Sequence, residues 1–269
     1  MGSSRLPGKV LMKLDEKYTV LEYVVKQISQ SKLVNKVIIA TTNLEQDNVI
    51  QKKANELGIK CFRGSSDNVL DRYYECAKKF GLDDILRITS DCPLIDPNIV
   101  DKVIEKYLTK DYDYVSNTLI RTFPLGTDSE IFSFDILEKS WQNASLLSEK
   151  EHVTPYIINK ENGFRLGNIK NELNVGQLRL TLDRIEDYEL IKKIVKKIER
   201  RPIFMKDVLK LFSEEPELIK INAHIPANEG MLKSLKRDED EKNKIIWWNV
   251  WNFIAFSKYS EIELFLTNK

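Results

Sequence analysis

The chain has 269 residues, of which 42% are hydrophobic, so it can bury the core of one large α/β domain. Its 42 basic and 41 acidic residues give a formal charge of +1, which excludes a global basic field for nucleic acid or an anionic membrane. Three scattered cysteines without a Cys-x-x-Cys pair, and no apolar run of about 18 residues, predict a cytoplasmic protein with reduced thiols, no signal peptide and no transmembrane helix.

The first nine residues form a loop rich in glycine and serine with two basic side chains, which is typical of a phosphate-binding site. Glycine lets backbone amides turn together toward an anion, serine adds hydroxyl donors, and the basic residues add charge. The residues concerned are Gly2, Ser3, Ser4, Arg5, Gly8 and Lys9. The glycine spacing does not match a P-loop, and a disordered N-terminus is the alternative interpretation.

An alternating series of helices and strands is expected after the loop. Leu21, Val24, Val25 and Ile28 have helical spacing and predict an amphipathic helix over residues 18–31. Similar patterns predict strands at 36–40, 59–62 and 85–89, and helices at 45–57 and at 67–80 with Asp67 as the cap. This order predicts a doubly wound, mostly parallel α/β sheet with ligands at the carboxyl ends of its strands.

Polar residues stand at the expected carboxyl ends of these strands. They are Thr41 and Thr42 after the first strand, Arg63 after the second and Asp91 after the third. A carboxylate directly after a buried strand can hold a hard divalent cation against phosphate. It can equally close a turn by bonding its own backbone, so both interpretations of Asp91 stay open.

A second carboxylate follows the apolar stretch Leu180-Thr-Leu, which we interpret as another strand. At its end, Asp183 could complete a Mg²⁺ site with Asp91, because Mg²⁺ is often held by two carboxylates while it keeps most of its waters. Glu186 and Asp187 come next, in the first turn of an expected helix. Acidic side chains favour the helix dipole there, which is the simpler interpretation of these two residues.

The middle segment, residues 114–130, carries polar side chains around an expected hairpin and could bind the hydroxyl and anionic groups of a sugar. The candidates are Asn117, Arg121, Asp128 and Glu130. His152 lies in a helical stretch before Pro155 and could contact an acceptor or a phosphate. A solvated polar turn, and a packed or surface helix residue for His152, are the alternatives.

In their order along the chain, these residues resemble the cytidylyltransferase family that contains 3-deoxy-manno-octulosonate and acylneuraminate cytidylyltransferases, and most closely its spore-coat polysaccharide biosynthesis protein F branch. The resemblance spans residues 1–235 and rests on Gly2-Ser-Ser-Arg-Leu-Pro-Gly-Lys9, Ile39-Ala-Thr-Thr42, Arg63-Gly64 with Val69-Leu-Asp-Arg-Tyr73, Arg87-Ile-Thr-Ser-Asp-Cys-Pro-Leu-Ile-Asp96, Glu151-His-Val-Thr-Pro-Tyr156 and Leu180-Thr-Leu-Asp183. It implies a fold like that of nucleotide-diphospho-sugar transferases, with sugar recognition in the middle segment. The residues it implies are Arg5 and Lys9 for the triphosphate, Asp91 and Asp183 for Mg²⁺, and Thr41, Thr42 and Arg63 for the nucleotide.

The chain departs from this family at its start. Family members have a buried strand, usually central in the sheet, directly before the Gly-Ser-Ser-Arg loop, whereas Met1 here begins on the loop. We therefore expect a sheet without its first strand, with backbone groups unpaired along an apolar trench. Either the sequence begins downstream of its natural start, which we favour, or the C-terminal tail fills the gap, or the sheet is rearranged.

Composition separates the C-terminal part from the rest. We assign residues 1–235 to a nucleotidyltransferase domain and residues 236–269 to a charged linker and an aromatic tail. Residues 245–256 of the tail hold three of the four tryptophans and are too few to cross a bilayer. They are apolar enough to pack on their own domain or to contact a partner, such as the second copy of a homodimer.

The predicted function is Mg²⁺-dependent transfer of CMP from CTP, or of another NMP from its NTP, to a sugar acid or sugar phosphate, with release of pyrophosphate, for surface polysaccharide or glycoconjugate synthesis. An acceptor oxygen would attack the α-phosphorus in line, while Arg5, Lys9 and loop amides neutralise the leaving pyrophosphate. Leu125 replaces an acidic residue of the family, which leaves the acceptor open. The alternatives are a glycosyltransferase that uses a nucleotide sugar and a truncated, inactive nucleotide-binding or scaffold protein.

Overall fold

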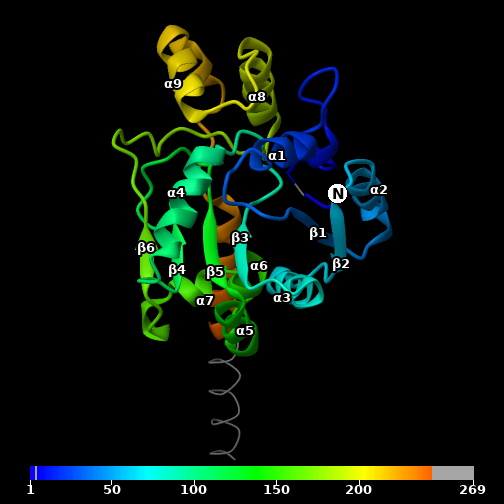
Figure 1. Cartoon of the computed structure of the whole chain (residues 1–269), viewed down its shortest axis with the longest axis vertical. Helices are drawn as coiled ribbons and strands as arrows, with labels where there is room; N and C mark the ends of the chain where they lie inside the picture. The colour runs from blue at the N-terminus through cyan, green and yellow to red at the C-terminus, as the bar shows by residue number, and fades with distance from the viewer. Residues whose placement is uncertain (4, 244–269) are drawn as a thin grey trace, which may run out of the picture.

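The computed structural model describes residues 1–3 and 5–243 and has the expected α/β architecture (Figure 1). Its strands are β1 (Ile38–Thr42), β2 (Lys60–Gly64), β3 (Asp84–Arg87), β4 (Tyr114–Ser116), β5 (Glu130–Ser133) and β6 (Leu166–Asn168). β1 and β2 pair in parallel, and the other strands form a second sheet in the order β3-β5-β4-β6. β5 runs antiparallel to β3 and β4, and β6 is parallel to β4, so β3, β4 and β6 share one direction, as a mostly parallel sheet requires.

Helices alternate with the strands as the apolar spacing predicts. The α-helices are α1 (Val20–Ile28), α2 (Asn48–Glu56), α3 (Val69–Phe80), α4 (Pro97–Leu108), α5 (Phe134–Asn143), α6 (Leu147–His152), α7 (Pro155–Ile158), α8 (Ile185–Lys197) and α9 (Met205–Glu214), and residues 229–243 are also helical. The 3₁₀ turns are η1 (Lys9–Leu11), η2 (Glu45–Asp47), η3 (Lys160–Asn162) and η4 (Pro216–Ile221). The three helices predicted before β3 are confirmed as α1, η2 with α2, and α3, all within the predicted bounds.

Side-chain caps fix where the helices begin. At α1, Thr19 and Glu22 form a capping box: Glu22 N donates to the Thr19 hydroxyl, and Thr19 N donates to the Glu22 carboxylate at 2.7 Å. At α3, Asn68 Oδ1 accepts a hydrogen bond from Asp71 N at 2.9 Å. The prediction of Asp67 as the cap of this helix is therefore wrong, because Asn68 directly precedes the first helical residue.

The predicted strand at residues 180–183 is also wrong. Leu180 and Leu182 are fully buried in a cluster with side chains of α8 and α9, which lie together at the upper end of the molecule in Figure 1. Their segment forms no strand, and its strand-like pairing in the described structure is one isolated bridge, between Arg179 and Leu125. Its backbone N–H groups donate to carbonyls of loops and not to a neighbouring strand. Leu180 N donates to Leu125 O at 2.6 Å, and Leu182 N donates to Asp91 O at 2.8 Å.

The helix at residues 229–243 closes the described part of the chain. It runs across the predicted boundary between residues 235 and 236, and its Asp238 accepts a hydrogen bond from Ser148 N in α6 at 3.2 Å. Residues 245–256 lie outside the described residues, so the two C-terminal assignments stay predictions. Within residues 1–3 and 5–243, no helix combines the length and apolar character needed to cross a membrane, and all three cysteines are free thiols.

Candidate active site

The two carboxylates of the predicted metal site converge on one lysine. Lys9 lies in η1, directly after the N-terminal loop, and its ammonium group donates to Asp91 Oδ2 at 2.7 Å and to Asp183 Oδ1 at 2.8 Å. Arg5 donates to the same Asp183 oxygen at 2.5 Å. The fold thus brings together the phosphate loop, the turn after β3 and the segment before α8, which are far apart in the sequence.

The N-terminal loop is folded into a turn that depends on one of its two glycines. Gly8 has a φ of 72°, in the left-handed region that glycine adopts without strain, and its N–H donates to Met1 O at 3.2 Å. Gly2 has no positive φ, so the observed loop conformation does not need the backbone freedom of a glycine at that position. Ser3 Oγ accepts a backbone N–H of the loop at 3.3 Å, and Ser4 lies outside the described residues.

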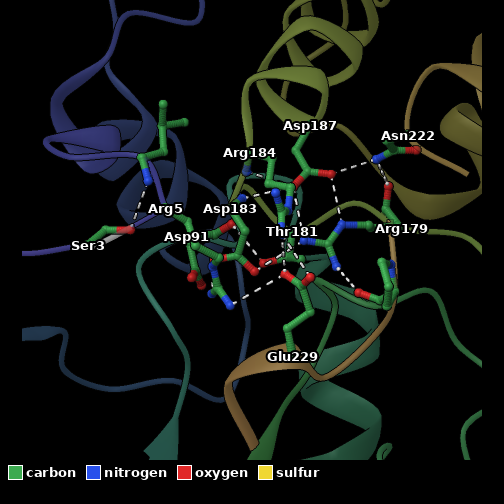
Figure 2. Close-up of polar contacts among 12 residues, drawn as sticks. Ser3, Arg5, Asp91, Arg179, Thr181, Asp183, Arg184, Asp187, Asn222 and Glu229 are labelled. Carbon is green, nitrogen blue, oxygen red and sulfur yellow. Dashed lines mark hydrogen bonds and ion pairs between the residues drawn. The ribbon is translucent and has the colours of Figure 1, made fainter. Parts of the chain in front are cut away.

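Arg5 also faces the start of the C-terminal helix. Its guanidinium is 3.9 Å from the carboxylate of Glu229, the first residue of the helix at 229–243. Glu229 pairs with Arg184 as well, at 2.8 Å (Figure 2). This carboxylate at a helix N-terminus, where the dipole favours negative charge, therefore holds two guanidinium groups beside the phosphate loop.

Hydrogen bonds to the main chain fix the positions of the two site carboxylates relative to each other. Asp91 O accepts Leu182 N at 2.8 Å and the Thr181 hydroxyl at 3.4 Å, so the turn after β3 is tied to the residues before Asp183. Gly126 allows the segment that carries Asp183 to pass closely. Its φ is 101°, and a Cβ added there would lie 2.4 Å from the backbone of that segment.

A buried ion network beside Asp183 is a feature that our sequence analysis missed (Figure 2). Asp187 is 0% exposed and accepts the N–H groups of Asp183 at 2.9 Å and Arg184 at 3.0 Å, at the first turn of α8. Arg179 donates to both oxygens of Asp187, at 2.8 and 3.0 Å, and to Asp183 Oδ2 at 3.2 Å. Asn222 adds a hydrogen bond to Asp187 at 2.8 Å. The network therefore fixes both the backbone and one oxygen of Asp183, whose other oxygen contacts Lys9.

The charges of the site stabilise one another. Burial alone would raise the pKa of Asp183, but the positive charges of Lys9 and Arg5 outweigh burial and lower that pKa below its usual range. Burial alone would lower the pKa of Lys9, but Asp91 and Asp183 outweigh it and raise that pKa. At neutral pH Asp183 is therefore ionised and Lys9 is protonated.

This set of oxygen donors fits a divalent cation of the magnesium type. Two carboxylate oxygens from separate segments already reach a single cation, the Lys9 ammonium, at 2.7 and 2.8 Å. Mg²⁺ is commonly held by one or two carboxylates together with waters and substrate phosphates. No group of three or more His, Cys, Asp or Glu side chains that could hold a metal occurs among the described residues. A cation bound by Asp91 and Asp183 would therefore need waters or phosphate oxygens to complete its shell.

Thr41 and Thr42 lie at the carboxyl end of β1 and bind Asp47. Their hydroxyls donate to Asp47 Oδ2 at 2.9 and 2.6 Å, and the Met1 ammonium group donates to Oδ1 at 2.6 Å. Burial alone would raise the pKa of Asp47, but these contacts lower it to about 2. The end of β1 is thereby tied to the start of the phosphate loop, and base contacts by Thr41 and Thr42 stay a prediction.

Arg63 and Asn117 use their polar groups within the protein. Arg63 bonds residues that follow β1, with contacts of 2.8 Å to the Leu44 carbonyl in the loop and to Asn48 Oδ1 at the start of α2. Asn117 is fully buried and bonds the backbone of Thr127 and Ser129 at 2.8 and 2.9 Å. The nucleotide contact of Arg63 and the sugar contact of Asn117 stay predictions.

Arg121 and Asp128 form a bidentate ion pair near the turn that carries Asp91. The two guanidinium nitrogens donate to the two carboxylate oxygens at 2.7 and 2.9 Å, and both side chains are half-buried. Burial alone would lower the pKa of Arg121, but the contacts with Asp128 raise it. The pair lies close enough to the thiol of Cys92, the neighbour of Asp91 in the sequence, to interact with it electrostatically.

Glu130 and His152, the remaining candidate substrate contacts, both have partners within the protein. Glu130 is buried on β5, where it accepts a hydrogen bond from the Tyr114 hydroxyl at 2.6 Å and pairs with Arg87. His152 ends α6 as predicted for a helical residue, and its Nε2 is 3.0 Å from the Ser234 hydroxyl. Burial lowers the pKa of His152, which favours the neutral ring. The sugar contact of Glu130 and the contact of His152 with an acceptor or a phosphate stay predictions.

Comparisons with known sequences match most of the chain. The sequence model of the family described as cytidylyltransferase matches residues 1–220. An uncharacterised protein of Methanocaldococcus jannaschii is 37% identical over 226 residues, which cover 83% of this chain and 91% of that protein. The spore coat polysaccharide biosynthesis protein SpsF of Bacillus subtilis is 32% identical over 225 residues, which cover 81% of this chain and 92% of that protein.

Solved structures share the same architecture. A cytidylyltransferase from Leptospira borgpetersenii has a TM-score of 0.78 at 33% identity, over 81% of this chain and 92% of that chain. The structure titled CMP:2-keto-3-deoxy-manno-octonic acid synthetase complexed with CTP has a TM-score of 0.57 at 14% identity, over 73% of this chain and 95% of that chain. The second likeness supports the fold alone, and both agree with the α/β class expected from the alternating elements.

Proposed function

The chain belongs to the cytidylyltransferase family, as its motifs predicted, and we propose that it transfers CMP from CTP to a sugar acid or a sugar phosphate with release of pyrophosphate. The observation that carries the proposal is the convergence of Asp91 and Asp183 on Lys9, at the end of a loop with phosphate-binding character. The Bacillus subtilis relative, which is named for polysaccharide biosynthesis, supports a role of the product in surface polysaccharide or glycoconjugate synthesis.

In the proposed mechanism the basic residues exchange partners when CTP binds. Lys9 and Arg5 leave Asp183 and bind oxygens of the triphosphate, whose greater charge competes with one carboxylate. Arg5 can place two N–H groups on phosphate, and Lys9 contributes a single mobile charge. Both groups then neutralise the leaving pyrophosphate as the acceptor oxygen attacks the α-phosphorus in line.

The carboxylates that Lys9 releases are then free to bind a cation. Asp91 and Asp183 are the residues that would hold Mg²⁺, which would supply positive charge to stabilise the triphosphate. The buried network around Asp187 keeps Asp183 in position for this role, because it holds the Asp183 backbone and one of its oxygens. The reaction needs no covalent intermediate with the protein.

We assign acceptor and base recognition to opposite sides of this site. Arg121 and Asp128 are half-buried beside the turn that carries Asp91, so the guanidinium can bind a carboxylate or phosphate of the acceptor and Asp128 can accept its hydroxyls. Thr41 and Thr42, at the end of β1, are the proposed contacts for the base. CTP would then extend from β1 across the phosphate loop to the carboxylates.

A panel of four nucleoside triphosphates, each with sugar phosphates and with ulosonic acids, tests the proposal through pyrophosphate release in the presence of Mg²⁺. We expect release with CTP and one of these acceptor classes, and its loss in Asp91→Asn. Consumption of a nucleotide sugar without pyrophosphate release would identify a glycosyltransferase. Binding of CTP without turnover on any acceptor would identify an inactive nucleotide-binding protein, and either result overturns the proposal.

A further inference from the structure

Arg184 places a further positive charge beside the candidate active site. It directly follows Asp183 in the sequence, and its side chain is 43% exposed. Its backbone N–H donates to the buried Asp187 at 3.0 Å, so the network that fixes Asp183 also fixes the point from which the Arg184 side chain extends. The guanidinium itself bonds elsewhere, because its Nη2 donates to the two carboxylate oxygens of Glu229 at 2.8 and 3.1 Å.

Glu229 links Arg184 to the phosphate loop (Figure 2). One Glu229 oxygen lies 3.1 Å from Arg184 Nη2 and 3.9 Å from Arg5 Nη1, so these two nitrogens are at most about 7 Å apart. Two like charges at such a distance repel each other unless an anion lies between them. A single carboxylate is therefore the anion that holds the guanidinium groups of Arg5 and Arg184 together.

A phosphate group would suit the place of this carboxylate better than Glu229 does. A terminal phosphate carries about 1.5 to 2 negative charges at neutral pH and has three acceptor oxygens, whereas a carboxylate carries one charge. Each guanidinium can direct two N–H donors at phosphate oxygens. The Arg184 end of the pair with Glu229 is open to water, and ion pairs of exposed side chains are weak because water screens their charges. Phosphate should therefore displace Glu229.

Arg179, the other arginine beside Asp183, is not available for a phosphate. It is 7% exposed, and it donates to both oxygens of Asp187 at 2.8 and 3.0 Å. Arg184 lies close enough to Arg179 for their charges to repel. A phosphate bound by Arg184 would therefore also offset the charge of Arg179, while Arg179 keeps its buried partner.

We propose that Arg184 is a third cation that binds the triphosphate, beside Arg5 and Lys9, and that Glu229 occupies the place of a phosphate until the nucleotide binds. This role rests on the proposed function, because it assumes that a triphosphate enters the site. On binding, Arg184 and Arg5 transfer their N–H donors from Glu229 to phosphate oxygens. Glu229 then remains at the first turn of the helix at 229–243, where the helix dipole and the charge of Lys233 favour a carboxylate.

Arg184 and Glu229 should consequently have opposite effects on the affinity for phosphates. Loss of Arg184 removes a cation that binds the ligand, so the affinity should fall. Loss of the Glu229 charge removes a competitor of the ligand, so the affinity should rise. A Glu229 that merely orients the two arginines would have the reverse effect, because its loss would let them move and would weaken binding.

The test measures the Kd of inorganic tripolyphosphate for the full chain by isothermal titration calorimetry without Mg²⁺. We expect Arg184→Gln to raise this Kd roughly tenfold and Glu229→Gln to lower it roughly threefold. The gain from Glu229→Gln should shrink when Arg184→Gln is also present. Arg165→Gln is the matched control, since Arg165 is 59% exposed and forms an ion pair of 2.8 Å with Asp113. This control should leave the Kd unchanged, and all variants should keep the Tm of the unmodified protein within about 2 °C.

An unchanged Kd in Arg184→Gln would overturn the proposal, and so would weaker binding in Glu229→Gln. Tripolyphosphate has neither a base nor a sugar, so these results do not depend on the reaction that the protein catalyses. The expected shifts in Kd without pyrophosphate release from CTP would support the role of Arg184 and overturn the proposed function. Normal CTP turnover with an unchanged Kd and KM in Arg184→Gln would overturn the role of Arg184 and leave the proposed function in place.

Discussion

Replacement of Asp187 by asparagine should destabilise the protein more than any change in the exposed part of the site. The carboxylate is 0% exposed and accepts five hydrogen bonds, two from backbone N–H groups, two from Arg179 and one from Asn222. Asparagine keeps the shape but removes the charge and turns one acceptor into a donor. Arg179, itself 7% exposed, would then face a donor at one of its two bonds to residue 187, and its contacts elsewhere, to Asp183 at 3.2 Å and to Pro226 O at 3.4 Å, are long.

The expected loss is about 3–5 kcal/mol in the free energy of unfolding, which is typical when one partner of a buried ion pair is removed. Urea unfolding of Asp187→Asn against the unmodified protein measures it. Glu186→Gln is the matched control, since Glu186 occupies the same helix turn, is 37% exposed and, among the described residues, has one ion pair within 4 Å, with His224 at 3.8 Å. This control should change stability by less than about 0.5 kcal/mol.

The same variant should need more Mg²⁺ for half-maximal turnover, because the Asp183 N–H loses the acceptor that fixes its backbone. Glu186→Gln should leave that Mg²⁺ concentration unchanged. A loss of less than about 1 kcal/mol in Asp187→Asn would refute the reasoning, since it would mean that the Arg179 charge is compensated without Asp187.

Three further predictions concern the charged groups of the site. Asp91→Asn and Asp183→Asn should each reduce Mg²⁺-dependent turnover by roughly 1,000-fold with an unchanged circular dichroism spectrum, and near-normal turnover would remove that residue from the metal site. Arg5→Lys should reduce kcat/KM for CTP by roughly 10- to 100-fold because two aligned N–H donors are lost, so an unchanged value would argue against bidentate binding. Asp47, whose pKa is lowered to about 2, should contribute about 2 kcal/mol of stability above a pH of about 4 and lose it as the pH falls toward 2. In thermal unfolding across this range, the Tm of Asp47→Asn should fall less steeply with decreasing pH than the Tm of the unmodified protein. Equal slopes in the two proteins would contradict this assignment.

The sequence allowed the candidate phosphate loop, the alternation of helices and strands before residue 90 and both candidate site carboxylates to be named, because these depend on local patterns. Helical spacing identifies α1, and a polar residue after an apolar run marks a strand end wherever that strand lies in the sheet. The convergence of Asp91 and Asp183 is predicted from two strand ends at one edge of a parallel sheet, but Asp183 reaches that edge on a segment that is not a strand and that bonds Asp91 O. The strand predicted before Asp183 is wrong because burial of Leu180 and Leu182 gives the same alternation as a strand, while their hydrogen bonds go to loops.

The network around Asp187 could not be predicted from such patterns. Its place in the first turn of α8 suggested no more than a contribution to the helix dipole. Arg179 precedes it by eight residues on a non-helical segment, and Asn222 follows it by 35, so no short-range spacing links the three. The available signal was the arginine itself, because an arginine next to buried leucines needs an acidic partner.

The proposed CTP site has two parts with different supports. Asp91 and Asp183 depend on the turn after β3 and on the Arg179 network, which belong to the side of the four-stranded sheet. Thr41 and Thr42 depend on β1, which pairs with β2 in a separate two-stranded sheet. In the proposed mechanism CTP spans both parts, whereas Mg²⁺ would be held by the first alone. Thr42→Val should therefore raise KM for CTP while the Mg²⁺ concentration for half-maximal turnover stays the same, and an equal change in both quantities would show that the two parts of the site are not separate.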